Sequence, residues 1–110
     1  MKKETIDAVN RFRDERHWRQ FHNPKDLAIS ISLEAAELLE LFQWKSNEEV
    51  VGVKDGALKD ELADILIYCA MLSDDLGLDI DAIVMEKLKK NAEKYPVEKS
   101  RDNKRKYNEL

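Results

Sequence analysis

Glu34-Ala35-Ala36-Glu37 and Glu61-Leu62-Ala63-Asp64 are two pairs of acidic residues, and within each pair the acids are three residues apart. Residues three apart share a face of an α-helix, so each stretch predicts a helix that presents two carboxylates on one side. Helical spacing also brings apolar residues onto these faces: Leu27, Leu33, Leu38 and Leu41 in the first stretch, and Leu58, Ile65 and Leu72 in the second. We therefore expect two packed helices whose acids point partly toward the core.

A partly buried cluster of acids indicates a metal site. An ionised carboxylate in the core is costly unless it is paired or bound to a metal, and neighbouring carboxylates repel one another unless a cation offsets them. Carboxylate oxygens are the usual ligands of Mg²⁺. The hypothesis is a divalent-metal site between the two helices. The alternative stays open, because 23 of the 110 residues are acidic and such pairs also occur on solvated helix faces.

Composition limits the class of protein. A chain of 110 residues with 43% apolar residues predicts one globular domain, and three Gly with two Pro favour long helices with few turns. The net charge of −4 argues against a general nucleic-acid binder. Cys69 is the one cysteine, so no internal disulfide is possible and a reducing compartment is expected. Its helical spacing from Leu62, Ile65 and Leu72 predicts that it lies in the core. No apolar run indicates a membrane span or a signal peptide, so we expect a cytoplasmic protein with no membrane partner.

The expected fold class is all-α, a four-helix bundle. Start signals precede three predicted helices: Asn23 with Pro24, the capping box of Ser46 and Glu49, and Asp79. The four main helices are predicted at residues 4–19, 24–45, 57–76 and 80–94, with a short one at 47–53. Residues 1–96 are expected to form the domain and 97–110 a polar, basic tail, which is either a solvated end or an arm that reaches phosphates or a neighbouring subunit.

Aromatic and basic residues are candidates for binding a substrate. Trp18 and Trp44 lie at helix ends beside polar residues and could stack on a base, although such side chains more often belong to a core or an interface. His22 could donate to a base or a phosphate, or it is a solvated loop residue. Lys87 and Asn91 share a helix face that could meet phosphates or simply face solvent. The sequence contains no Glu-x-x-His pair, Gly-rich phosphate loop or Cys-x-x-Cys.

Several short motifs, in this order along the chain, resemble one known family. They are Phe21-His22-Asn23-Pro24, the pair Glu34/Glu37, Phe42-Gln43-Trp44-Lys45, the pair Glu61/Asp64, and Tyr95-Pro96. Over residues 5–107 the chain resembles the MazG-like all-α nucleoside triphosphate pyrophosphohydrolases, and within them the dCTP pyrophosphatase branch. The resemblance implies an oligomeric enzyme, a tetramer more readily than a dimer. It would cleave a nucleoside triphosphate between the α and β phosphates to give the monophosphate and pyrophosphate, in the house-cleaning of nucleotide pools.

The resemblance also implies roles for residues. Mg²⁺ would be the cofactor, held by Glu34, Glu37, Glu61 and Asp64, and Glu34 is the leading candidate for the general base. Trp18, His22, Trp44 and Tyr68 match positions around the nucleotide, while Lys87 and Asn91 match positions near the phosphates. The substrate would be dCTP or a modified dCTP.

Two departures from the family pattern bear on base selectivity. Val9 aligns with a position that is His in animal relatives, and the 46–56 connection is shorter than theirs. The alternative function is a non-catalytic helical oligomerisation or regulatory module that retains the scaffold. A weaker alternative is a nucleic-acid contact made by the basic tail.

Overall fold

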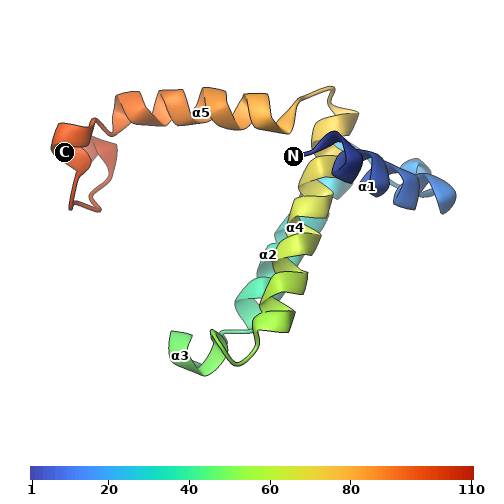
Figure 1. The fold of residues 1–110 in the computed structure, drawn as a ribbon, viewed down its shortest axis with the longest axis horizontal. Helices are drawn as coiled ribbons and strands as arrows, with labels where there is room; N and C mark the ends of the chain where they lie inside the picture. The colour runs from blue at the N-terminus through green and yellow to red at the C-terminus, as the bar shows by residue number, and fades with distance from the viewer. The chain divides into compact units, whose positions relative to one another are not determined.

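A computed structural model describes all 110 residues, which form two compact units, Met1–Gly77 and Leu78–Leu110. The first unit holds α1 (Lys3–Glu15), the 3₁₀-helix η1 (Trp18–Gln20), α2 (Pro24–Glu40), α3 (Asn47–Val50) and α4 (Asp55–Asp75) (Figure 1). The second holds α5 (Ile80–Lys94), α6 (Val97–Ser100) and the 3₁₀-helix η2 (Tyr107–Glu109). The all-α class is confirmed. The count of four helices is not, because short helices bring the α-helices to six.

The first unit is built on the pairing of α2 with α4, which lie side by side along their length, and α1 packs against α4 (Figure 1). The fully buried apolar side chains are few: Leu27, Val50, Ala70 and Met71. Cys69, expected in the core, is only half-buried, and burial raises the pKa of its thiol. No helix of the chain combines the length and the apolar character that crossing a bilayer would need.

Helix starts follow local side-chain chemistry. The side chain of Asn23 accepts a hydrogen bond from the backbone N–H of Asp26 at 2.9 Å, and Pro24 opens α2. Ser46 Oγ accepts from the N–H of Glu49 at 3.3 Å, and Asp79 accepts from the N–H of Ala82 at 2.9 Å. Each bond satisfies one of the N–H groups that a helix start leaves unpaired, so the three predicted caps are confirmed.

Three helix ends differ from the prediction by three residues or more. The first helix ends at Glu15 rather than at 19, because His17 has the left-handed backbone angle φ = 55° and the chain restarts as η1. The second ends at Glu40 rather than at 45, because the backbone N–H groups from Leu41 to Gln43 bond to the carbonyl three residues back and form a turn. The short helix ends at Val50 rather than at 53, because Val51 has an extended backbone. A left-handed residue such as His17 cannot continue a right-handed helix, so it marks the stop of α1.

In the second unit, α5 has the predicted bounds, and the tail beyond it is folded. Tyr107 from η2 packs edge-to-face against Tyr95, with ring centroids 6.1 Å apart. The ammonium group of Lys94 lies 4.9 Å from the centre of the Tyr107 ring. These contacts return the end of the chain to the end of α5. The functional division at residue 96 stays a prediction.

Candidate active site

The predicted carboxylates meet where α2 packs on α4. Glu34 from α2 and Glu61 and Asp64 from α4 each offer one oxygen, and these oxygens all lie within 4.8 Å of one another. Glu37 interacts with both Glu34 and Glu61. The spacing of three residues within each pair places both acids of a helix on the surface it presents to the other. The structure therefore brings together the four acids that the sequence singled out.

These acids are in an unfavourable state without a cation. Glu34 Oε2 and Glu61 Oε2 are buried and have no hydrogen-bond partner. The pKa of Glu34 is raised to about 7, and burial is the largest cause. The hydrogen bond and charge of Glu37 come next, followed by the charges of Asp64 and Glu61. Burial and Glu37 also raise the pKa of Glu61. Buried oxygens without partners are what a bound ion would satisfy, since unpaired buried polar groups are otherwise rare.

The donor set fits a hard divalent cation. All ligands on offer are carboxylate oxygens, with no thiolate or imidazole among them, and this is the donor type that Mg²⁺ and Ca²⁺ take. Mg²⁺ is usually held by one or two carboxylates together with waters and substrate phosphates. The cluster leaves room for such waters and phosphates, because Glu34 and Asp64 also border a cavity.

Such a cavity adjoins the cluster, with a volume of about 490 Å³. Glu34 and Asp64 contribute to its wall, so the cluster and the cavity share two side chains. The rest of the wall is mostly apolar and comes from α1, η1 and α4: Thr5, Ala8, Val9, Phe12, Trp18, Ile67, Tyr68 and Met71. Aromatic walls next to an acidic end that could hold a metal suit a ligand with a flat apolar part and a charged tail.

The predicted substrate residues fall into three groups. Trp18 and Tyr68 line the cavity. His22 is not among the lining residues but packs against Trp18, with ring centroids 6.4 Å apart in an edge-to-face arrangement. Trp44 lies in the turn after α2 with 92% of its surface exposed, and Lys87 and Asn91 belong to α5 in the second unit. The roles of all six residues in substrate binding stay predictions.

Several cavity residues were not identified from the sequence. Thr5, Ala8 and Phe12 form the α1 side of the wall, and Ile67 and Met71 form part of the α4 side. The ring of Phe12 lies 5.5 Å from that of Trp18, edge-to-face, and together they form an aromatic corner. The helical spacing of apolar residues on α1 was a signal, but core packing produces the same spacing.

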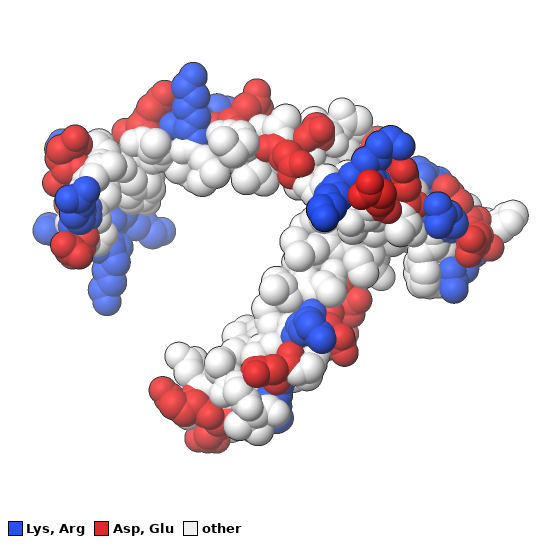
Figure 2. Space-filling view, viewed as in Figure 1, with Lys and Arg blue, Asp and Glu red and all other residues white.

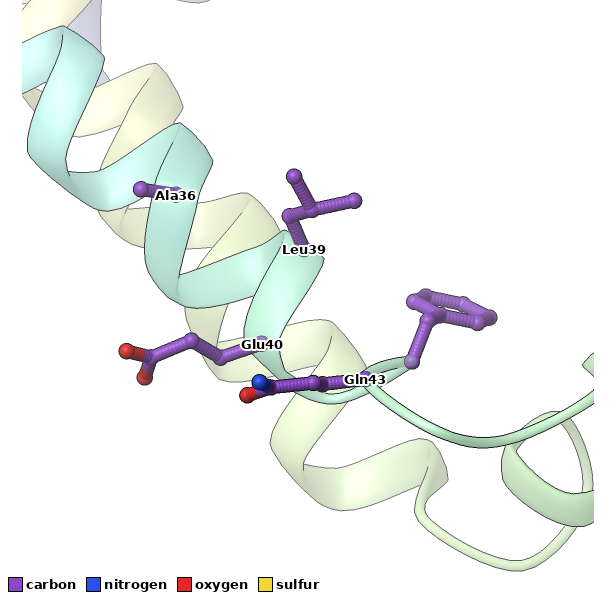
Figure 3. Close-up of a pocket in the computed structure, with 5 residues that line it drawn as sticks. Ala36, Leu39, Glu40 and Gln43 are labelled. Atoms are coloured by element: carbon purple, nitrogen blue, oxygen red, sulfur yellow. The ribbon is translucent and has the colours of Figure 1, made fainter.

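A second hollow, at the end of α2, has a different character. It has a volume of about 420 Å³ and is formed by Ala36, Leu39, Glu40, Phe42 and Gln43 (Figure 3). One acid contributes to it, and the carboxylate cluster does not. It therefore has neither a cluster of acids that could hold a metal nor a Lys or Arg that could bind a phosphate.

The chain is similar to one known protein family and to several proteins named as pyrophosphatases. A family model described as the MazG-like family matches residues 29–110. Three relatives are named dCTP pyrophosphatase 1, and their sequences are identical to this chain at 39% of positions in Rattus norvegicus, 38% in Homo sapiens and 40% in Bos taurus. Each match covers 96% of this chain and 68% of the relative. The crystal structure of a pyrophosphatase from Archaeoglobus fulgidus superposes with a TM-score of 0.81 and 44% identity, and the match covers 86% of this chain and 91% of that one.

Proposed function

This chain belongs to the MazG-like family, and from that premise we propose that it hydrolyses dCTP or a modified dCTP between the α and β phosphates. The predicted enzyme class, a nucleoside triphosphate pyrophosphohydrolase, is borne out by the relatives named dCTP pyrophosphatase and by the pyrophosphatase of similar structure. The observation that carries the proposal is the junction of the carboxylate cluster with the aromatic-walled cavity, which share Glu34 and Asp64.

In this proposal Glu34, Glu37, Glu61 and Asp64 hold Mg²⁺. The bound ion would neutralise the triphosphate and polarise the α-phosphoryl group. Phosphoryl transfer of this kind needs positioning and charge stabilisation more than a covalent nucleophile, which agrees with a site that lacks one.

The chain's own side chains then have separate roles. Trp18 and Tyr68 stack on the base and place the triphosphate toward the acids. Glu34, which belongs both to the carboxylate cluster and to the cavity wall, accepts a proton from the attacking water. The water oxygen bonds to the α phosphorus, the bond from that phosphorus to the bridging oxygen breaks, and pyrophosphate leaves. His22, Trp44, Lys87 and Asn91 complete the proposed substrate contacts.

The proposal extends to assembly and cellular role. Large exposed apolar side chains on α2 and α4 favour a homo-oligomer: Ile29, Leu33, Leu39, Leu62 and Leu66. Figure 2 shows a length of the α2–α4 pair without charged side chains, between the charged groups of α1 and those near α3. Because dCTP is a DNA precursor, we propose house-cleaning of the nucleotide pool in the cytoplasm.

The decisive experiment is pyrophosphate release from a panel of deoxy- and ribonucleoside triphosphates, with Mg²⁺ and with EDTA. We expect Mg²⁺-dependent turnover that is strongest on dCTP or a 5-substituted dCTP. Turnover on another base would retain the chemistry and correct the substrate. No turnover on any nucleotide by the folded protein, together with a melting temperature that Mg²⁺ leaves unchanged, would instead support the non-catalytic helical module.

A further inference from the structure

Arg13, near the end of α1, is the one charged residue of the chain that is completely buried, with 0% of its surface exposed. Its guanidinium donates two hydrogen bonds to the carboxylate of Asp75, at 2.7 and 3.0 Å, and two to Asn10 Oδ1, at 2.9 and 3.1 Å. A weaker contact of 3.4 Å reaches Asp74. Because Asp75 is the last residue of α4, the ion pair fastens the end of α1 to the end of α4.

The same guanidinium faces a residue of the proposed substrate site. Arg13 Nη1 lies 3.5 Å from His22 Nδ1, just before α2 begins. A guanidinium has N–H donors and no acceptor, so the ring nitrogen that faces it must be the one without a proton. A neutral His22 then carries its proton on Nε2, and that nitrogen is available as a donor.

The surroundings of His22 favour its neutral form. Burial is the largest influence and lowers the pKa of the imidazole, the charges of Arg13 and Arg19 lower it further, and the charge of Asp75 opposes them. Arg19 is itself tied to Asp14 and Asp75, so its charge is held in place. His22 in turn packs edge-to-face on Trp18, which lines the cavity.

We propose that Arg13 is a positioning residue that fixes His22 as a neutral Nε2–H donor and holds Trp18 at the edge of the nucleotide cavity. Arg13 does not line the cavity, and its N–H groups already have protein acceptors, so it acts through His22 and Trp18 and not on the substrate directly. This proposal rests on the proposed function for its effect on catalysis, although the tautomer of His22 can be measured without turnover.

The first test is ¹⁵N NMR of the two imidazoles in the full chain at neutral pH, with His17→Gln used to assign the signals. We expect His22 to be neutral, with its proton on Nε2. In Arg13→Lys, which retains the charge but loses the two-pronged geometry, we expect a mixture of tautomers. A His22 protonated on Nδ1 in the unaltered chain, or an unchanged Nε2–H tautomer in folded Arg13→Lys, would overturn the proposal.

The second test is kinetic and uses Arg11→Lys as the control, because Arg11 is an exposed arginine on the same helix. We expect Arg13→Lys to raise KM about tenfold, the value of one hydrogen bond of ordinary strength, while kcat changes by less than about twofold. Arg11→Lys should change neither constant. If Arg13→Lys fails to fold, Asp75→Asn perturbs the same guanidinium and takes its place. An unchanged KM in the folded variant would contradict the positioning role.

The two levels of proposal can fail separately. If the unaltered chain hydrolyses no nucleotide, the proposed function falls, while the NMR result still decides whether Arg13 sets the state of His22. If the unaltered chain is active and the KM of the folded variant is normal, the proposed function stands and the positioning role falls.

Discussion

Glu34 holds its proton more tightly in the folded, metal-free protein than in the unfolded chain, because its pKa rises from 4.5 to about 7 on folding. Between about pH 4.5 and about pH 7 the native state therefore binds more protons than the unfolded state. The stability that protonated Glu34 contributes is therefore lost as the pH rises and its carboxyl group ionises. We expect the melting temperature in EDTA to fall as the pH rises through this window, and Mg²⁺ to reverse most of the fall.

The control for this prediction is Glu34→Gln, which removes the titrating group and retains its shape. In that variant the melting temperature in EDTA should depend less on pH than in the unaltered chain. A melting temperature that rises through the same window in the unaltered chain would contradict the assignment of a raised pKa to Glu34.

Glu61 supplies one of the two buried oxygens without partners, so it tests the metal site directly. Glu61→Gln retains the size of the side chain but removes a negative charge that would bind the ion. We expect pyrophosphate release to fall about 100-fold, which corresponds to roughly 2.7 kcal/mol of transition-state stabilisation. Circular dichroism should show an intact helical fold, and Mg²⁺ should no longer raise the melting temperature.

Asp60→Asn is the matched control, because Asp60 is the exposed neighbour of Glu61 on α4. It removes the same charge from the same helix outside the cluster, so activity and Mg²⁺ response should be retained. Equal activity in Glu61→Gln and the unaltered chain would remove the metal-site assignment.

Among the helices, α5 matched its predicted bounds and three starts matched their predicted caps, because capping is a local event between residues two or three apart. The ends of α1 and α2 could not be predicted in the same way. The side chains give no signal for the left-handed conformation of His17, which glycine usually supplies, or for the turn at residues 41–44 that follows α2. Such a stop depends on how the next segment packs.

The carboxylate cluster was predictable because helical spacing alone aligns Glu34 with Glu37 and Glu61 with Asp64. The cavity was not, since its wall depends on which face of α1 meets α4. Thr5 and Phe12 become cavity residues only through that contact. Likewise, the ion pair of the buried Arg13 could not be predicted, because its partner Asp75 is remote along the chain.

Asn23 tests how far one cap supports the helix that carries Glu34 and Glu37. Asn23→Ala removes the 2.9 Å bond to the N–H of Asp26 and should lower the free energy of unfolding by about 1 kcal/mol in urea titrations. Ser32→Ala, an exposed change in the middle of α2, should have little effect or be slightly stabilising. An equal loss in the two variants would show that the cap bond contributes nothing of its own.

For the molecule as a whole, the small buried core contrasts with the number of large apolar side chains left exposed. Within the first unit, Leu33, Leu39, Leu62 and Leu66 are exposed on α2 and α4. A stable monomer rarely exposes large continuous apolar patches, since removing each square ångström from water gains roughly 25 cal/mol. We therefore expect a second copy of the chain to cover these leucines in the proposed oligomer.

Leu39 tests that assembly, because 71% of its surface is exposed and it borders the hollow at the end of α2 (Figure 3). Leu39→Glu places a charge where an apolar contact between copies is proposed. Since Leu39 is not part of the monomer's core, the helices should persist. We expect light scattering coupled to size-exclusion chromatography to show a smaller species or a dissociation constant raised about tenfold or more, a loss of roughly 1.4 kcal/mol.

Lys59→Glu, which adds a carboxylate at an exposed site on α4, should leave the mass unchanged. An unaltered mass for Leu39→Glu at all concentrations would exclude this face from the interface.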